Sequence, residues 1–165
     1  MSAAVLFSLF VPGIPRPAGS KKAIPVWNRK TGGFAHAANG RPIVAVTDAS
    51  KGSRAWKDRI SALAVEQWKD APLDGPLGLR VTFTMPRPKS HYWKRRGALF
   101  LKDAAPLFHT GPPDATKLTR AVEDALNGIV LKDDRLIAEQ HVRKLYGAVA
   151  GALISIARPS AEGVA

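Results

Sequence analysis

Carboxylates are concentrated in one stretch of a basic chain. The sequence has 25 lysines and arginines against 13 aspartates and glutamates, yet six of these acids fall within residues 114–139. The six are Asp114, Glu123, Asp124, Asp133, Asp134 and Glu139. Clusters of oxygen ligands suit Mg²⁺ or Mn²⁺, which take their remaining ligands from water and substrate phosphate. Beside a phosphodiester, such a metal can polarise the phosphoryl oxygen and orient an attacking water. The stretch therefore suggests metal-assisted phosphodiester chemistry.

The overall charge and the lack of cysteine narrow the classes of function. The formal net charge of +12 and the isoelectric point of about 10.5 favour a polyanionic partner, nucleic acid before an acidic membrane surface. No basic amphipathic helix has a clean apolar face, so we expect no membrane partner. Without cysteine, disulfides, Cys-ligated zinc and a Cys nucleophile are excluded. The apolar run at residues 3–15 is too short to span a membrane and follows no basic segment, so we expect a cytoplasmic protein.

A predicted helix and the turn after it must position the acids. Pro112-Pro113-Asp114 is typical of a helix start, because proline suits the first turn and an acid there faces the positive end of the helix dipole. Apolar residues recur at helical spacing from Leu118 to Leu126, and Asn127-Gly128 predicts a left-handed cap. Residues 129–131 are expected to be briefly extended, and the chain then turns through Lys132-Asp133-Asp134 into a second extended segment. If helix and segment run side by side, two or three carboxylates converge.

Spacing alone leaves a purely structural interpretation open. Asp114 is equally explained by the helix dipole. Asp124, Arg120 and Lys117 lie on the same polar side of the helix. Asp124 follows Arg120 by four residues, so Asp124 and Arg120 could form an ion pair. Asp133-Asp134 is equally typical of a turn before a strand.

The remaining elements predict one mixed domain. Trp56, Ile60 and Trp68 share the apolar face of a predicted helix over about residues 53–70. Apolar or alternating runs elsewhere indicate strands. We expect strands over residues 4–11, 77–86, 135–146 and 148–157, and a hairpin that turns near residues 30–33 within a basic segment rich in proline and glycine. The fold class is α/β (α+β): one domain over residues 1–158, with a mixed sheet of about four to six strands flanked by two main helices, and a tail over residues 159–165.

The acidic stretch resembles the RusA-type Holliday junction resolvases, whose motif runs roughly P-D-x-D-N-L-x-K-x-x-x-D-A-L-N-G and then K-D-D. Four parts of this chain match the motif in residue type and spacing: Pro113-Asp114, Leu118, the block at residues 124–128, and Lys132-Asp133-Asp134. The similarity extends to FSLFVPGIPRPAGSKK near the start and to VTFTMPRPKSHYWKR, as in phage-associated members. Most of residues 5–157 can be laid onto the family.

The resemblance implies roles for individual residues. Asp114 and Asp134 stand where the family has metal-binding aspartates, with Asp133 beside them as a helper. Arg120 replaces a catalytic lysine; it keeps the positive charge but cannot act as a proton donor. Two further departures weaken the match: Thr116 stands where the family has its second aspartate, and Lys117 replaces an asparagine. Asp124, Asp133 and Glu139 all remain candidates for a third metal ligand.

The basic segments are the expected DNA contacts. These candidates are Lys21, Lys22, Arg87, Lys89, Lys94, Arg95, Arg96 and Lys117, joined by Arg29 and Lys30. Pro86 and Pro88 predict an irregular loop for the segment that carries the cations from Arg87 to Arg96. Within this loop, Tyr92 and Trp93 either stack on bases or pack over the sheet edge. The four histidines show no metal-ligand spacing and are taken as structural.

The expected function is a Mg²⁺-dependent endodeoxyribonuclease, with Mn²⁺ as the alternative metal, that resolves four-way DNA junctions. The two-fold symmetry of a four-way junction favours a homodimer. Two other readings stay open. The departure at Thr116 fits a branched-DNA-binding protein with weakened or lost cleavage. A basic RNA- or DNA-binding module with purely structural acids is the third.

Overall fold

A four-stranded sheet forms the centre of the computed structural model, which describes residues 4–19, 21–48 and 52–159. The strands lie in the order β1 (Val5–Pro12), β10 (Gly151–Ala157), β6 (Leu77–Pro86) and β9 (Ile137–Gly147). β1 and β6 both pair antiparallel with β10, whereas β6 and β9 run parallel. The predicted mixed sheet of a single α+β domain is therefore confirmed.

One face of this sheet is buried and the other is open. In β6 the odd-numbered residues from Leu77 to Met85 are buried, while the residues between them are not. Phe7 and Leu9 of β1 and Ile154 of β10 are buried in the same core. Because side chains alternate across a strand, the residues between these point to the opposite face of the sheet.

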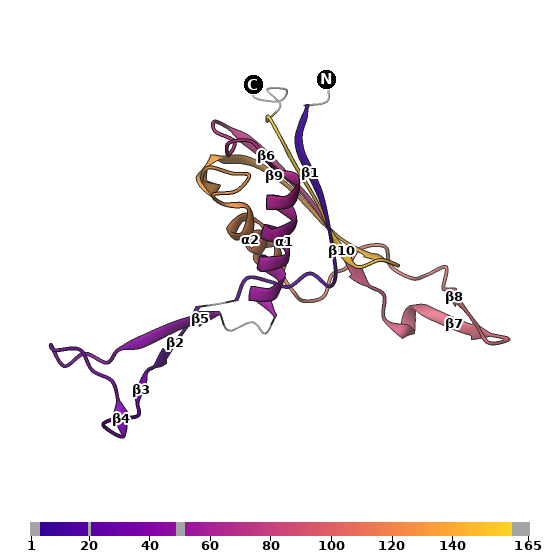
Figure 1. The fold of residues 1–165 in the computed structure, drawn as a ribbon. Coiled ribbons are helices and arrows are strands. Elements are labelled where there is room, and N and C mark those ends of the chain that lie inside the picture. Colours follow the sequence, from indigo (N-terminus) through magenta and orange to yellow (C-terminus); the bar gives the residue numbers. More distant parts are fainter. Residues whose placement is uncertain (1–3, 20, 49–51, 160–165) are drawn as a thin grey trace.

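Both helices cover the buried face of the sheet (Figure 1). α1 (Ser53–Gln67) buries Trp56, Ile60 and Ala64, and it ends three residues before the predicted residue 70. Trp68 is the C-cap residue of this helix, and its ring packs edge-on against Phe7, with ring centroids 5.8 Å apart. α2 (Ala115–Leu126) buries the predicted apolar stripe, namely Leu118, Ala121, Val122, Ala125 and Leu126. Gly128 has the expected left-handed conformation, with a φ of 77°, but it does not cap the helix: Asn127 at the C-cap is extended, and the Gly128 N–H donates to the Leu131 carbonyl in the turn that follows.

Two β structures project from this body in different directions (Figure 1). The first, which we call the arm, spans residues 21–48 and contains β2 (Lys21–Pro25), β3 (Trp27–Asn28), β4 (Gly33–Phe34) and β5 (Val44–Asp48). The second is the β7–β8 hairpin, formed by β7 (Tyr92–Arg95) and β8 (Ala98–Leu101) after a short 3₁₀ turn, η1 (Lys89–His91). The expected turn near residues 30–33 is present between β3 and β4.

The expectation of an irregular loop after Pro88 is wrong. Pro86 and Pro88 do stop the preceding strand, but they lie before the β7–β8 hairpin and leave its ladder intact. Arg96 and Gly97 have φ values of 49° and 84°, which is the pair of positive angles that a tight two-residue hairpin turn requires.

A second expectation fails at residues 129–131, which are not extended. The chain turns there, with the N–H groups of Ile129 and Val130 both donating to the carbonyl of Leu126. Val130 and Leu131 are fully buried, so this turn is anchored in the core before the chain reaches η2 (Asp134–Leu136).

Candidate functional site

Asp114 occupies the N-cap position of α2, as the sequence predicts. Its side chain makes no capping hydrogen bond and instead forms an ion pair with Lys117, at 3.6 Å. The Asp114 side chain is 69% exposed. The carboxylate is therefore not used by the helix start and remains open to a ligand.

A lysine on the sheet holds the segment that leads into Asp114. The Lys144 Nζ donates to the carbonyl of Gly111 at 2.7 Å and to that of Pro113 at 2.6 Å. Pro113 follows Pro112 through a cis peptide bond. Lys144 thus connects β9 to the start of α2, and it fixes the residue immediately before Asp114.

The side chains of two acids adjacent in sequence on α2 point in different directions. Asp124 points to the other helix, where its Oδ2 lies 3.6 Å from the Nζ of Lys57. The expected pair between Asp124 and Arg120 is therefore replaced by a contact between helices. Glu123 points instead toward β9, where it accepts a hydrogen bond from the side chain of Gln140.

Glu123 is the residue that the sequence reasoning passed over, and it lies within the electrostatic reach of Asp134. Burial, followed by the negative charges of Asp134 and Asp124, raises the pKa of Glu123; the nearby Arg120 partly offsets this. Thr116, Arg120 and Glu123 stand at i, i+4 and i+7 along one side of α2. This periodicity was the one available signal that Glu123 shares a face with the expected catalytic positions.

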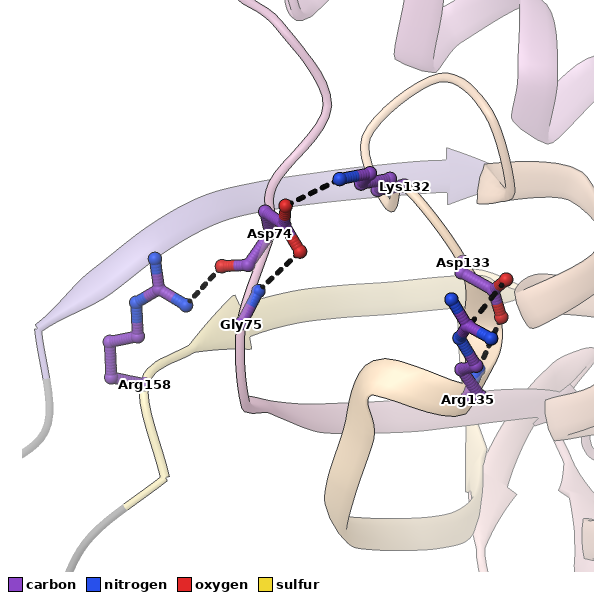
Figure 2. Close-up of polar contacts among 6 residues, drawn as sticks. All are labelled: Asp74, Gly75, Lys132, Asp133, Arg135 and Arg158. Carbon is purple, nitrogen blue, oxygen red and sulfur yellow. Dashed lines mark hydrogen bonds and ion pairs between the residues drawn. The ribbon is translucent and has the colours of Figure 1, made fainter.

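The loop that carries Asp133 and Asp134 is fixed to the segment around Leu73 and Asp74, just before β6 (Figure 2). Lys132 binds the Asp74 carboxylate at 2.6 Å, and this bond lowers the pKa of Asp74. The backbone N–H of Lys132 also donates to the Leu73 carbonyl. Arg158 donates to the Asp74 carbonyl at 2.7 Å. The lysine of the K-D-D block thus has a structural contact of its own.

Asp133 and Asp134 differ in how far they are already engaged. Asp133 caps η2, accepting from the backbone N–H of Arg135 at 3.0 Å and pairing with its Nε at 3.4 Å (Figure 2). Asp134 is the first residue of η2 and acts on Glu123. The turn interpretation therefore describes Asp133 well, whereas Asp134 is close enough to Glu123 for its charge to raise the pKa of that residue.

The described residues contain no group of three or more His, Asp or Glu side chains arranged to hold a metal ion. A converging set of three carboxylates is therefore not found there. Of the three candidate third ligands, Asp124 contacts α1 and Asp133 contacts Arg135. Glu139 lies beside Gly78 on the open face of the sheet, opposite to Gln140 and Glu123. Mg²⁺ needs only one or two carboxylates when water and phosphate complete its shell.

Most of the expected DNA contacts lie on the two projecting structures. Lys94, Arg95 and Arg96 are exposed on the β7–β8 hairpin, and Lys89 is exposed on η1 at its base. Lys21 and Lys22 belong to the first strand of the arm, but their side chains lie outside the described part of the structure. Lys117 instead lies beside Asp114 on α2.

Arg87, at the base of the β7–β8 hairpin, contacts other residues of the protein. It donates to the Pro106 carbonyl at 2.8 Å and lies over the Tyr146 ring, 5.6 Å from the centroid. The rings of His91 and His109 also pack on Tyr146, at 4.7 and 4.8 Å. These two histidines are therefore structural, as expected, and burial lowers the pKa of His109.

Trp93 does not pack over the edge of the central sheet. It stacks on Phe100, its cross-strand partner, with ring centroids 5.1 Å apart and an interplanar angle of 27°. Both rings stay partly exposed, at 43% and 46%. The hairpin therefore carries an aromatic face within a group of cations.

Comparison with known proteins adds one finding to this geometry. The family model described as endodeoxyribonuclease RusA matches residues 30–157, which is well over half of the chain. No curated protein matches the sequence. Among the described residues, no helix is both long and apolar enough to cross a membrane.

Proposed function

Because this chain belongs to the RusA endodeoxyribonuclease family, we propose that it is a metal-dependent nuclease that resolves four-way DNA junctions by paired phosphodiester hydrolysis. The observation that carries this proposal is the family match over residues 30–157 of a strongly basic chain. Within the matched range, the charge of Asp134 acts on the half-buried Glu123 and Arg120 only partly offsets it, so a bound cation would relieve the remaining repulsion.

Asp134 and Glu123 hold the ion in this proposal, and Asp114 joins them from the start of α2. A bound Mg²⁺, or Mn²⁺, supplies Lewis-acid polarisation of the phosphate and orients a water. Asp133 holds the turn in place through Arg135. Lys144 fixes the approach to Asp114.

Arg120 stabilises the negative charge that develops on the phosphate. It is exposed on the same side of α2 as Glu123 and close enough to affect its pKa. A guanidinium keeps its charge and can bind two phosphate oxygens at once, although it cannot protonate the leaving oxygen. The proton for that oxygen then comes from water.

A homodimer places two such sites on the two-fold symmetric junction. The open face of the sheet is the surface we assign to this contact. Phe10 and Leu153 are cross-strand partners on that face, and each is 48% exposed. Burying this face against a second copy would remove apolar area from water.

Substitution of Asp134 by asparagine tests the proposed function. It removes one charge with little change in shape, so we expect it to abolish nicking of a four-way junction while junction binding in EDTA stays within about twofold. Asp58→Asn is the matched control, because Asp58 is exposed on α1 and its ion-pair partner within the described ranges is Arg54, at 3.9 Å. Undiminished nicking by the Asp134 variant would contradict the assigned site.

A junction-binding protein without cleavage is the second candidate, and Thr116 favours it. Thr116 is exposed on α2 where the family motif carries an aspartate, and a hydroxyl brings no charge to the metal. Equal binding by wild type and the Asp134 variant, with no nicks from either in Mg²⁺ or Mn²⁺, would establish this alternative.

A further inference from the structure

Over residues 23–45, where side chains are described, the arm has no hydrophobic core. β2 and β5 form its stem, beyond which the chain forks into two short hairpins, residues 27–34 and 35–42. Three backbone bonds close the fork: Val26 donates to Ile43 at 2.9 Å, Ile43 to Ala35 at 2.8 Å, and Ala35 to Val26 at 2.7 Å. No residue from 23 to 45 is buried. Because an isolated two-stranded hairpin is marginally stable in water, the arm is suited to lie against a partner.

The arm exposes large apolar side chains, led by an aromatic pair. Trp27 and Phe34 are cross-strand partners whose rings meet edge to face, with centroids 5.3 Å apart at 87°. Each is 55% exposed. The other exposed large apolar residues of the arm are Ile24, Ile43 and Val44. Flat, exposed rings present a surface on which bases can stack.

The charge of the arm identifies the class of partner. Residues 23–47 include Arg29, Lys30 and Arg41 and contain no aspartate or glutamate. The structure describes no ion pair for any of these three cations. A second copy of this chain would bring a further net charge of +12 toward them, whereas DNA phosphates neutralise them and release counterions. Charge complementarity therefore favours DNA over a second copy.

We propose that the arm binds branched DNA at the branch point, with Trp27 and Phe34 stacking on exposed bases and Arg29 and Lys30 contacting the phosphates beside them. Bases at a branch are more easily unstacked than those inside a duplex, so stacking there costs less. The arm extends away from α2 and the sheet (Figure 1), so it reaches DNA at a distance from the proposed cleavage site. This inference rests on the proposed function, and it adds a structure-selective contact to it.

Two variants test the arm in the full-length protein. Trp27→Ala/Phe34→Ala removes the stacking surface, and Arg29→Gln/Lys30→Gln removes charge while keeping the rings. Val65→Ala/Lys69→Ala is the control, because it removes an exposed apolar residue from α1 and an exposed cation just beyond its C-terminal end. Binding is measured in EDTA to a four-way junction with 2-aminopurine at the branch point, and to a linear duplex of the same sequence. Sedimentation gives the oligomeric state, and circular dichroism checks the fold.

The stacking variant should bind the junction about tenfold more weakly, as expected for losing one or two stacked bases, and should lose the fluorescence change at the branch point. Its affinity for duplex should change less than twofold. The charge variant should reduce the slope of log Kd against log salt by about two. The control should match wild type in every measurement.

Two results would overturn the inference. One is unchanged junction affinity and fluorescence in both variants; the other is unchanged DNA binding together with loss of the dimer, which would assign the arm to a second copy. Either result leaves the proposed function standing if wild type still nicks junctions. If wild type neither binds nor nicks junctions, the proposed function itself fails.

Discussion

Glu123 on α2 lies within reach of the negative charge of Asp134 at the start of η2. Burial and the Asp134 charge together raise the pKa of Glu123, so ionisation of this side chain costs the folded protein free energy. The turn that connects α2 to η2 is anchored by the buried Val130 and Leu131, and this fixes where Asp134 lies relative to Glu123. A proposed metal site thus coincides with a local instability, a common feature of functional sites.

Replacing Glu123 with glutamine should stabilise the protein and impair it as an enzyme. Glutamine keeps an oxygen that can accept from Gln140 but removes the repulsion with Asp134. We expect a higher Tm without metal at pH 7, and a loss of about 10–100-fold in metal affinity. Calorimetry measures the first and nicking against Mg²⁺ concentration the second. A lower Tm with normal metal dependence would show that Glu123 is structural.

The same variant predicts a definite pH dependence. The pKa of Glu123 in the folded protein lies above its ordinary value of 4.5. The folded state therefore gains stability as the pH falls through the raised value, and the charge-repulsion penalty disappears below 4.5. The Tm difference between Glu123→Gln and wild type should be largest near neutral pH and vanish in acid. A difference that grows in acid would reverse the assigned sign.

Lys144→Met should destabilise the loop before Asp114. Hydrogen bonds to charged groups are each worth about 1.5–3 kcal/mol, and Lys144 makes two to the carbonyls of Gly111 and Pro113. Urea unfolding should show a loss of about 2–4 kcal/mol, because water can replace part of these bonds. Nicking should fall even at temperatures where the variant is folded, because Asp114 is no longer held.

Lys132→Met provides the comparison for Lys144. Its ion pair with Asp74 is exposed, with side chains 62% and 61% accessible, and exposed pairs contribute about 0.2–1 kcal/mol. The unfolding free energy of this variant should therefore fall much less than that of Lys144→Met. Equal losses would mean that the Lys144 bonds are no stronger than a surface contact.

The β7–β8 hairpin should contribute salt-dependent affinity for DNA. Lys94 and Arg95 are exposed on one strand of it, and Lys94→Gln/Arg95→Gln removes two charges while Trp93 stays stacked on Phe100. The slope of log Kd against log salt should fall by about two, and binding to junction and duplex should weaken alike. Fluorescence titration across a range of salt concentrations measures this. An unchanged slope would remove the hairpin from the DNA contacts.

Local patterns were enough to predict α2 and the central sheet. The helix start at Asp114 and the apolar stripe from Leu118 to Leu126 depend on neighbouring residues, and both are present as expected. β6 matches its predicted range of residues 77–86 because its alternation reflects one buried face. These features depend on sequence-local physics, which a single chain reveals.

The site itself depended on tertiary contacts that spacing does not contain. Asp124 and Glu123 are adjacent, but only packing decides that the first meets Lys57 and the second meets Gln140. Glu139 belongs to the same acidic stretch, yet strand alternation puts it on the far face of the sheet. The β7–β8 hairpin was missed because its prolines were read as breaking the segment that they merely precede.

Nicking of an end-labelled four-way junction beside a linear duplex of the same sequence tests the central claim most directly. The reaction is run at modest salt with Mg²⁺, with Mn²⁺ and with EDTA. We expect paired nicks in the junction alone, with either or both metals and none in EDTA, which would show that Thr116 and Arg120 are compatible with catalysis. Junction binding without nicks in either metal, or equal nicking of the duplex, would contradict the assignment of a junction-resolving nuclease.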